Sequence, residues 1–311
     1  MRGPKVVAMG GINFDLFLYT GGEEGLPEWG KCKRAKGGLV ALGGRGANQA
    51  VQAARLGAEV YLVGKVGSEP FMAVALERLK MEGVDTRFVF RGEGPSGMVA
   101  MFVFSGEAGS SFIDGANLEL SPKEVRMARG AFEGAGVALL QVSVNPEAYE
   151  EALRLAKECG AVVIADPSPA DMWRREWERL VDVIVPNRME AEQILGREIR
   201  SIPDAVGAAR EFCLSGCKVA VITLGEEGAV YCVEGGEEGH VPAFPVETVD
   251  PWGAGDAFAS ALGVRLAEGA EFGEALTFAS AAGAITATRK GAMDALPTRE
   301  EVEEFVKGRK G

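Results

Sequence analysis

The sequence predicts an α/β fold in which helices cover both faces of a mostly parallel sheet. Short β-branched apolar runs recur along the chain, and several are continuous, as in parallel strands that are buried on both faces. Helical patterns fill the intervals between these runs and stop at glycines such as Gly57 and Gly160. This alternation of strand and helix is typical of βαβ units and of a doubly wound sheet.

The individual elements follow from these patterns in chain order. Strands are expected at residues 6–9, 60–63, 137–141, 162–165, 183–185 and 219–223. Helices are expected at residues 47–56, 71–82, 146–159, 254–268, 272–289 and 299–307. The last three make the C-terminal third of the chain predominantly helical.

Two segments, residues 14–43 and 88–113, break the alternation. The first contains strand-like pieces at 31–35 and 39–42, and the second contains them at 88–91, 98–104 and 111–113, with glycine-bearing turns between. We expect the two segments to form a small antiparallel lid beside the main sheet; the alternative is extra edge strands. Because no linker, repeat or low-complexity tract divides the chain, we expect one domain over residues 1–311.

Composition excludes several classes of function. The 311 residues include 33 Lys and Arg against 45 Asp and Glu, a net charge of −12, whereas nucleic-acid binding requires a basic face. The single histidine, His240, lies in a polar stretch where we expect a solvated loop or strand edge, and it excludes metal sites built on two histidines. No C-x-x-C pair, signal-peptide pattern or long apolar stretch occurs, so we expect a soluble cytoplasmic protein with no membrane partner.

The first of two glycine clusters, residues 43–50, runs into a helix. Gly43 and Gly44 allow positive φ and close approach of the backbone, and the helix start offers unpaired N–H groups. Asn48 lies one turn into this helix, pointing toward whatever the loop covers. Gln49 stands where a dinucleotide fingerprint would need its third glycine, which disfavours a dinucleotide-dependent oxidoreductase.

The second cluster, residues 249–258, places Gly253, Ala254 and Gly255 at the start of a long apolar helix. The unpaired N–H groups and the positive dipole end predict an anion site. Asp256 would repel an anion there, unless it acts as a general base that takes a proton from a hydroxyl attacking a bound phosphorus. The alternative is that Asp256 only complements the helix dipole.

Two weaker motifs each follow a strand. Asn187 and Glu190 lie on one face of a first helical turn and could hold hydrated Mg²⁺, although the same pair fits helix capping. Thr223, Gly225 and Gly228 lie at the edge where open α/β proteins bind ligands, and they equally fit an ordinary hairpin.

Together these motifs resemble those of the ribokinase-like (PfkB) carbohydrate kinases. Residues 43–50 with Arg55-Leu56-Gly57 are similar to the family's first signature, residues 250–258 to its second, and Asn187-x-x-Glu190 to its magnesium motif. Residues 10–15 resemble its N-terminal sugar-contact segment, and residues 113–117 and 288–292 resemble segments of its ribokinase members. The resemblance spans nearly the whole chain, with the motifs in the family's order.

The resemblance implies a three-layer α/β/α core with a mostly parallel sheet and a β lid formed by about 14–43 and 88–113. It implies transfer of the γ-phosphoryl group of ATP to a hydroxymethyl group of ribose or a related sugar, with Mg²⁺, a monovalent cation such as K⁺ near Asp250, and a homodimer formed through the lid. Asp256 is the implied base, and the backbone of Gly253, Ala254 and Gly255 is the implied anion hole. By the same resemblance, the residues that contact the substrate are Asn13, Asp15, Gly43, Gly44, Arg45, Asn48 and Ser143. The residues that contact the nucleotide are Asn187, Thr223, Gly225 and Gly228, and those that hold metal ions are Glu190, Asn187 and Asp250.

Four positions depart from the family's pattern, among them Ala295, which lacks the hydroxyl often found near the cation site. Ser143 stands where members that act on ribose usually have a sugar-contacting Glu, and a short uncharged side chain leaves the identity of the sugar open. Arg45 replaces the common Lys, and so exchanges a point charge for a planar fork. Trp252 stands where a smaller residue is usual.

Two other functions remain as alternatives. A nucleoside kinase of the same family would need apolar lid walls, for which the candidates are Phe14, Phe102, Phe112 and Ile113. A non-catalytic sugar- or nucleotide-binding regulator is disfavoured by the intact motif around Asp256, because a pure binder needs no base.

Overall fold

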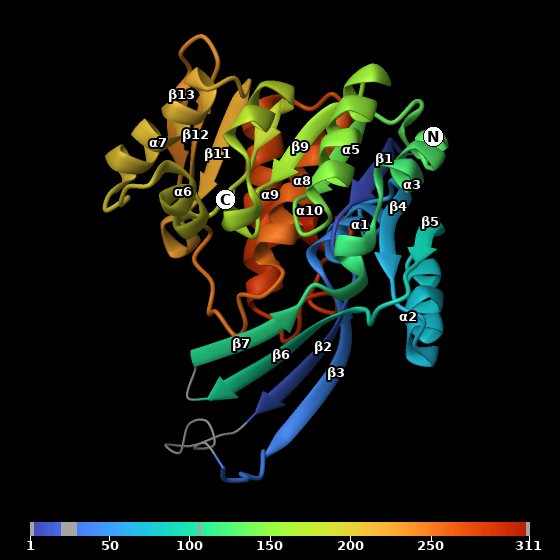
Figure 1. Cartoon of the computed structure of the whole chain (residues 1–311). Coiled ribbons are helices and arrows are strands. Elements are labelled where there is room, and N and C mark those ends of the chain that lie inside the picture. Colours follow the sequence, from blue (N-terminus) through green and yellow to red (C-terminus); the bar gives the residue numbers. More distant parts are fainter. Residues whose placement is uncertain (1–2, 20–29, 105–106, 309–311) are drawn as a thin grey trace.

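The computed structural model describes residues 3–19, 30–104 and 107–308 of the chain. In these residues a nine-stranded sheet lies between helices, and a four-stranded sheet projects from one end of this core (Figure 1). The large sheet contains β1 (Lys5–Met9), β4 (Glu59–Val66), β5 (Val84–Arg91), β8 (Val137–Gln141), β9 (Val162–Asp166), β10 (Val183–Ile184), β11 (Val219–Thr223), β12 (Ala229–Val233) and β13 (Glu238–Val241). The small sheet contains β2 (Asn13–Tyr19), β3 (Gly37–Gly43), β6 (Gly97–Phe104) and β7 (Glu107–Ile113).

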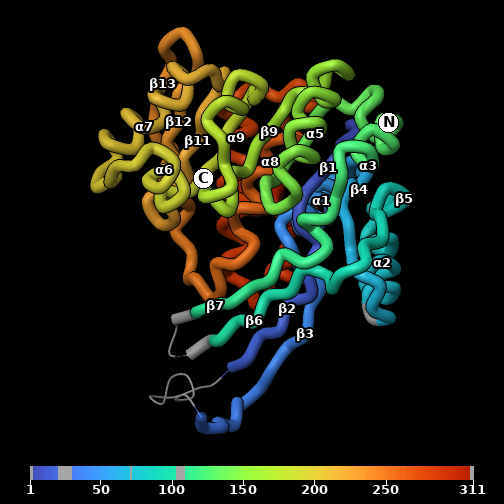
Figure 2. Tube along the Cα trace, viewed as in Figure 1, coloured from blue at the N-terminus to red at the C-terminus, as the bar shows by residue number. Residues whose placement is uncertain are grey.

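The helices cover the large sheet, and most of them lie where the sequence predicts. They are α1 (Arg45–Arg55), α2 (Pro70–Met81), α3 (Pro122–Met127), α4 (Arg129–Phe132), α5 (Pro146–Glu158), α6 (Arg188–Leu195), α7 (Ile202–Leu214), α8 (Ala254–Ala267), α9 (Phe272–Ala287) and α10 (Arg299–Lys307). Figure 2 follows the chain from β1 in the core into β2 of the small sheet and back to α1.

The large sheet has the strand order β13-β12-β11-β10-β9-β8-β1-β4-β5. Its neighbours are parallel, except that β12 is antiparallel to both β11 and β13. From β1 the chain first adds strands on one side, to β5, and then adds strands on the other side, from β8 onward. The predicted mostly parallel sheet is therefore confirmed, and its order reverses between β1 and β8.

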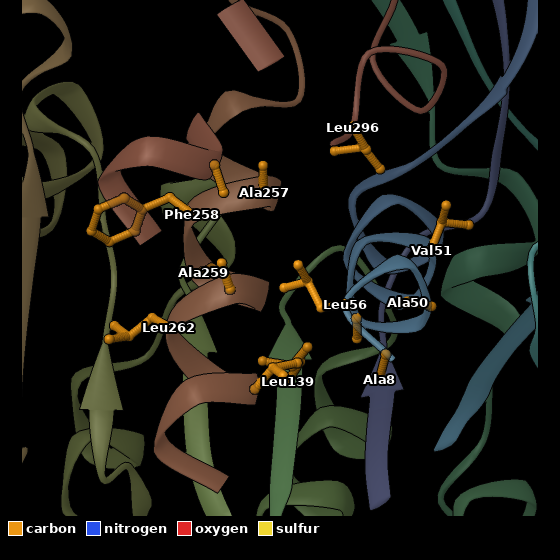
Figure 3. Close-up of a cluster of buried hydrophobic side chains, with 14 of the residues drawn as sticks. Ala8, Ala50, Val51, Leu56, Leu139, Ala257, Phe258, Ala259, Leu262 and Leu296 are labelled. Atoms are coloured by element: carbon orange, nitrogen blue, oxygen red, sulfur yellow. The ribbon is translucent and has the colours of Figure 1, made fainter. Parts of the chain in front are cut away.

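Successive residues of a strand point to opposite faces of the large sheet, and their side chains pack into two separate apolar clusters, one on each face. On β1, Val6 and Ala8 join the cluster beneath α1, α8 and α9, whereas Val7 and Met9 join the cluster beneath α3, α4 and α5. Figure 3 shows part of the first cluster, where small and branched side chains of β1, β8, α1 and α8 come together. Burial on both faces explains why these strands are continuously apolar and confirms the three-layer core.

The small sheet forms the predicted lid, with two corrections to its composition. Its order is β3-β2-β6-β7, and β2 is parallel to β6, so the lid is mixed rather than wholly antiparallel. Residues 88–91 belong to β5 at the edge of the large sheet, not to the lid, because the chain has no turn glycine between Val84 and Gly92 that would end the strand.

The N-terminal part of the lid differs from the prediction at one further place. Residues 31–35, which have a strand-like pattern, are irregular, and the strand begins only at Gly37. Residues 20–29 and 105–106 of the predicted lid segments lie outside the described residues.

Other expectations concern single residues. His240 lies on β13 at the edge of the large sheet, and its Nε2 lies 2.6 Å from the carbonyl oxygen of Glu227. All five cysteines are free thiols. Among the described residues, no helix is both long enough and apolar enough to cross a bilayer.

Candidate active site

The carboxyl ends of β1 and β8 meet where the strand order reverses, which is where open α/β sheets bind ligands. Gly10 and Gly11 follow β1, and Gln141 ends β8. The amide of Gly11 donates to Oε1 of Gln141 at 3.1 Å, and the hydroxyl of Ser143 donates to the same oxygen. Ser143 therefore lies against the loop that leads from the core into the lid.

Close packing of backbones joins this loop to the start of α1. Gly44 caps the helix with a φ of +90°, and a Cβ at this residue would lie 2.4 Å from the carbonyl oxygen of Gly11. A Cβ on Gly46 would lie 2.5 Å from the carbonyl carbon of Gly10. The positive φ and the close approach predicted for this glycine cluster are thus both present.

The start of α8 forms the other side of the site. Gly253 caps the helix with a φ of +83°, and the amide of Ala254 donates to the carbonyl of Pro251 at 3.2 Å. Gly255 and Asp256 follow in the first turn, where amides have no acceptor within the helix. A Cβ on Gly255 would meet no atom within 4 Å, so the helix start is open to a ligand there.

Asp256 lies at the junction of α8 and α1 and is 4% exposed. Its Oδ2 accepts from Nδ2 of Asn48 at 2.8 Å, and its Oδ1 accepts from Nε2 of Gln49 at 3.3 Å. Burial raises the pKa of Asp256, whereas the charge of Arg45 and these two hydrogen bonds lower it. A carboxylate that is fixed beside an anion site and has a raised pKa is suited to accept a proton from a hydroxyl.

A second buried carboxylate, Asp166, ends β9. Arg45 Nη1 lies 3.3 Å from both of its oxygens, and Arg45 Nη2 lies 3.4 Å from Oε1 of Glu190. Gln49 Nε2 donates to Asp166 at 2.7 Å. Burial raises the pKa of Asp166 to about 7, Arg45 opposes this, and the charges of Glu190 and Asp256 raise it further. The guanidinium of Arg45 thus lies near three carboxyl groups, those of Asp166, Glu190 and Asp256.

The lid supplies Asp15, which is 5% exposed and faces Asp256 across the site. Burial raises the pKa of Asp15 to about 7, with a further contribution from the charge of Asp256. A Cβ on Gly43 would lie 1.9 Å from Oδ2 of Asp15, so only glycine admits this carboxylate. Nearby, Asn13 Oδ1 accepts from Nδ2 of Asn117 at 2.9 Å.

Two acceptors in this region have no partner among the described residues. Oδ1 of Asp15 and Oδ1 of Asn48 are both buried without a hydrogen bond. Buried polar atoms are nearly always paired in folded proteins, so these two predict a ligand that donates hydroxyl groups to them. Asp15 lies in the lid and Asn48 in the core, and both residues lie near Asp256.

Asn187 and Glu190 form a capping box at the start of α6. Asn187 Oδ1 accepts from the Glu190 amide at 2.9 Å, and Glu190 Oε2 accepts from the Asn187 amide at 2.8 Å. The structure therefore shows the capping alternative for these atoms, while Oε1 of Glu190 faces Arg45. Asn187 also pairs with Thr223 through a parallel bridge, which brings the two weaker motifs together.

The turn after β11 contains the two remaining predicted nucleotide residues. Gly225 has a φ of +62° and open space where a Cβ would lie. Gly228 has a φ of +94°, and a Cβ there would lie 2.0 Å from the carbonyl oxygen of Val241. Gly228 is thus required by packing within the hairpin, whereas Gly225 is free to face a ligand.

Asp250 lies at a separate place, where it ties two loops together. Its Oδ2 accepts from the amide of Gly291 and its Oδ1 accepts from the amide of Trp252, both at 3.0 Å. The residues predicted for metals therefore fall into two places, Asn187 with Glu190 and Asp250 with the 289–291 loop. In the described part of the chain, no three or more His, Cys, Asp and Glu side chains are grouped to hold a metal.

Three buried polar residues of this site are absent from the sequence prediction: Gln49, Gln141 and Asp166. The last two each end a buried strand at the carboxyl edge of the sheet, and this placement could have identified them. Gln49 carries no such signal, because its side chain is one of several polar groups on α1.

Comparison with known proteins identifies the family. The model of the pfkB family of carbohydrate kinases matches residues 4–299, so the chain belongs to this family and is a carbohydrate kinase. It is 35% identical over 269 residues to a ribokinase of Haemophilus influenzae, covering 86% of this chain and 88% of the relative. It is 31% identical over 307 residues to a deoxyribokinase of Salmonella typhi, covering 97% and 98%.

Among solved structures, it is similar to Arabidopsis thaliana ribokinase complexed with ribose and ATP. The TM-score is 0.88 at 28% identity, and the match covers 98% of this chain and 99% of the other. This chain therefore has the ribokinase fold, with a lid beside a mostly parallel sheet, and belongs to the same family.

Proposed function

We propose that this protein transfers the γ-phosphoryl group of ATP to a hydroxymethyl group of ribose or a closely related sugar. The observation that carries the proposal is the pair of unpartnered acceptors on Asp15 and Asn48, two residues that both lie near the buried Asp256. They suit a small polyol, and they lie beside a helix start that suits a phosphoryl group. Relatives named ribokinase and deoxyribokinase support a pentose as acceptor.

In this proposal Asp256 accepts the proton of the attacking hydroxyl. Asn48 and Gln49 hold the carboxylate in place through their amide groups, so that it does not turn toward Arg45. The anion hole was expected from the backbone of Gly253, Ala254 and Gly255, but the amide of Ala254 already donates to Pro251. The amides of Gly255 and of the next residue, Asp256, therefore stabilise charge on the transferred group, and Gly253 gives the backbone the turn that exposes them. Catalysis then rests on positioning and on charge stabilisation, as phosphoryl transfer requires.

The donor set around Arg45 fits a hydrated Mg²⁺ held through few protein ligands. We propose that Glu190 and Asp166 hold such an ion through water, with Asn187 orienting Glu190. When bound, Mg²⁺ neutralises charge on the transferred phosphoryl group. We propose K⁺ for the second place, where Asp250 joins the 289–291 loop.

The lid has two faces, which suggest two further properties. On its site face, strand register places Asp15, Val99 and Phe112 in one row, and Phe112 is 58% exposed. This ring favours a nucleoside as the alternative acceptor. On its outer face, Leu16 lies opposite Val40, and these side chains are 37% and 53% exposed. We propose that this face joins two copies of the chain, which the mass in solution tests.

The proposed activity is tested by measuring ADP release with ATP and Mg²⁺ over ribose, deoxyribose, fructose, adenosine, inosine and pseudouridine. We expect the fastest turnover with a pentose, lost by orders of magnitude in Asp256→Asn, because the amide cannot accept the proton. The matched control is Asp204→Asn, which changes an exposed carboxylate on α7. Full activity of Asp256→Asn would overturn the role of this residue, and turnover of nucleosides alone would replace the sugar by the alternative acceptor.

A further inference from the structure

An ion pair spans the two segments that follow β10 and β11. Arg188, the first residue of α6, contacts the carboxylate of Glu227 in the turn after β11 through Nη2. The side chains are 30% and 47% exposed, so both can be reached by solvent. The pair lies directly beside the bridge between Asn187 and Thr223. None of the site residues considered so far belongs to this pair.

The geometry of the transfer places the phosphoryl donor near this pair. Asp15 puts the acceptor under the lid, beside β1, and α8 packs on β8 and β9 with its start at the anion site. In phosphoryl transfer the attacking and leaving oxygens lie roughly in line through the phosphorus. A nucleotide that extends from the anion site on the side away from the lid would lie over the ends of β10 and β11, which follow β9 in the strand order.

The negative charge of this region favours an additional cationic side chain that can move to bind phosphate. Arg45 already faces Asp166 and Glu190, and the whole chain carries a net charge of −12. A nucleoside triphosphate brings further negative charge. A guanidinium offers a planar fork that binds phosphate oxygens in pairs, which a lysine does not.

We infer that Arg188 and Glu227 form an exchangeable ion pair at the nucleotide site: Glu227 holds Arg188 in the free protein, and the polyphosphate of the nucleotide takes over the guanidinium. This inference rests on the proposed function for the identity of the donor. Arg188 is then a nucleotide-binding residue, and Glu227 competes with the nucleotide for it.

The backbone of the turn supports the exchange, because it is held independently of the ion pair. The carbonyl oxygen of Glu227 contacts His240 on β13, and the amide of Gly228 donates to the carbonyl of Gly225 at 3.0 Å. The turn therefore keeps its shape when the side chain of Glu227 loses its partner. Only two side chains have to move.

The test is titration calorimetry of the full chain with Mg²⁺ and a non-hydrolysable ATP analogue. Arg188→Ala should weaken binding by about tenfold, which is about 1.4 kcal/mol, because the contact between the guanidinium and the phosphate is lost. Glu227→Gln should tighten binding severalfold, because the guanidinium no longer has to leave a carboxylate. Binding of adenosine, which has no phosphate, should not change in either variant.

A matched control is the ion pair between Arg210 on α7 and Glu238 on β13, which is similarly exposed. Arg210→Ala and Glu238→Gln make the same charge changes away from the site and should leave nucleotide binding unchanged. Weaker binding in both Arg188→Ala and Glu227→Gln would show that the pair only braces the fold and would overturn the inference. Unchanged binding in Arg188→Ala would overturn it as well. If the nucleotide binds as inferred but no sugar is phosphorylated, the proposed function fails and the inference stands.

Discussion

The buried carboxylate of Asp15 should make the free protein less stable at neutral pH, and Asp15→Asn should remove that cost. The pKa of Asp15 is raised from 3.8 to about 7 by burial and by the charge of Asp256. Because the folded state binds this proton more tightly than the unfolded state, the stabilising contribution is complete below pH 3.8 and is lost as pH rises to about 7. Above that pH the charged side chain lowers the free energy of unfolding by a constant amount.

The magnitude follows from the shift. Each pKa unit corresponds to about 1.36 kcal/mol, so a shift of roughly three units costs about 4 kcal/mol above pH 7. At pH 5 the wild-type protein bears only about 1.6 kcal/mol of this cost by the same relation. An amide has nearly the shape of the protonated acid, so Asp15→Asn should be more stable than wild type by these amounts at the two pH values.

The assay is urea unfolding of both proteins between pH 4 and pH 8. The gain in Asp15→Asn should be only about 0.6 kcal/mol at pH 4, rise with pH and level off above pH 7, whereas Asp204→Asn should show no such rise. The same variant should lose protection by the sugar, because Oδ1 of Asp15 is one of the two unpartnered acceptors. A gain that does not depend on pH, or a loss of stability at pH 8, would refute the reasoning.

The remaining predictions concern the two ligands. Gly255→Ala should fold normally, since its Cβ would meet no atom within 4 Å, but it should raise KM for ATP severalfold by occupying space at the open start of α8. Steady-state kinetics with Asp204→Asn as control measure this, and an unchanged KM would place the phosphates elsewhere. Ser143→Glu should lower the Kd for ribose by adding an acceptor beside the loop at Gly11; calorimetry that shows equal or weaker binding would contradict it. KM for the sugar should rise as pH falls below about 7, because Asp15 then becomes protonated and binds hydroxyl donors less well.

Patterning alone predicted most of the core, because each strand is buried on two faces and each helix has clear boundaries. The sequence did not predict that β5 forms an edge strand of the large sheet. Its second half, residues 88–91, has the composition of a lid strand, and only pairing with β4 shows that it belongs to the large sheet. Register between distant segments depends on tertiary contacts, which a local pattern does not contain.

For the site, glycine clusters and their helices predicted where Asp256 and Asn48 would lie. The sequence did not predict that Gln49 and Arg45 would also reach Asp166, since these contacts cross 117 and 121 residues. Asn187 and Glu190 fitted two interpretations in the sequence; the structure contains the capping hydrogen bonds, and the metal is a proposal.

The hydrogen bond between Asn48 and Asp256 joins residues 208 positions apart. On a ribosome that adds about 5–20 residues per second, roughly 10–40 s separate the synthesis of these two residues. During that interval the nascent chain contains Asp15 and Asn48, the two residues with unpartnered acceptors, but not yet Asp256. If Asp256 is the base, as proposed, phosphoryl transfer has to wait until α8 has docked against α1, and a chain that lacks α8 cannot phosphorylate a sugar.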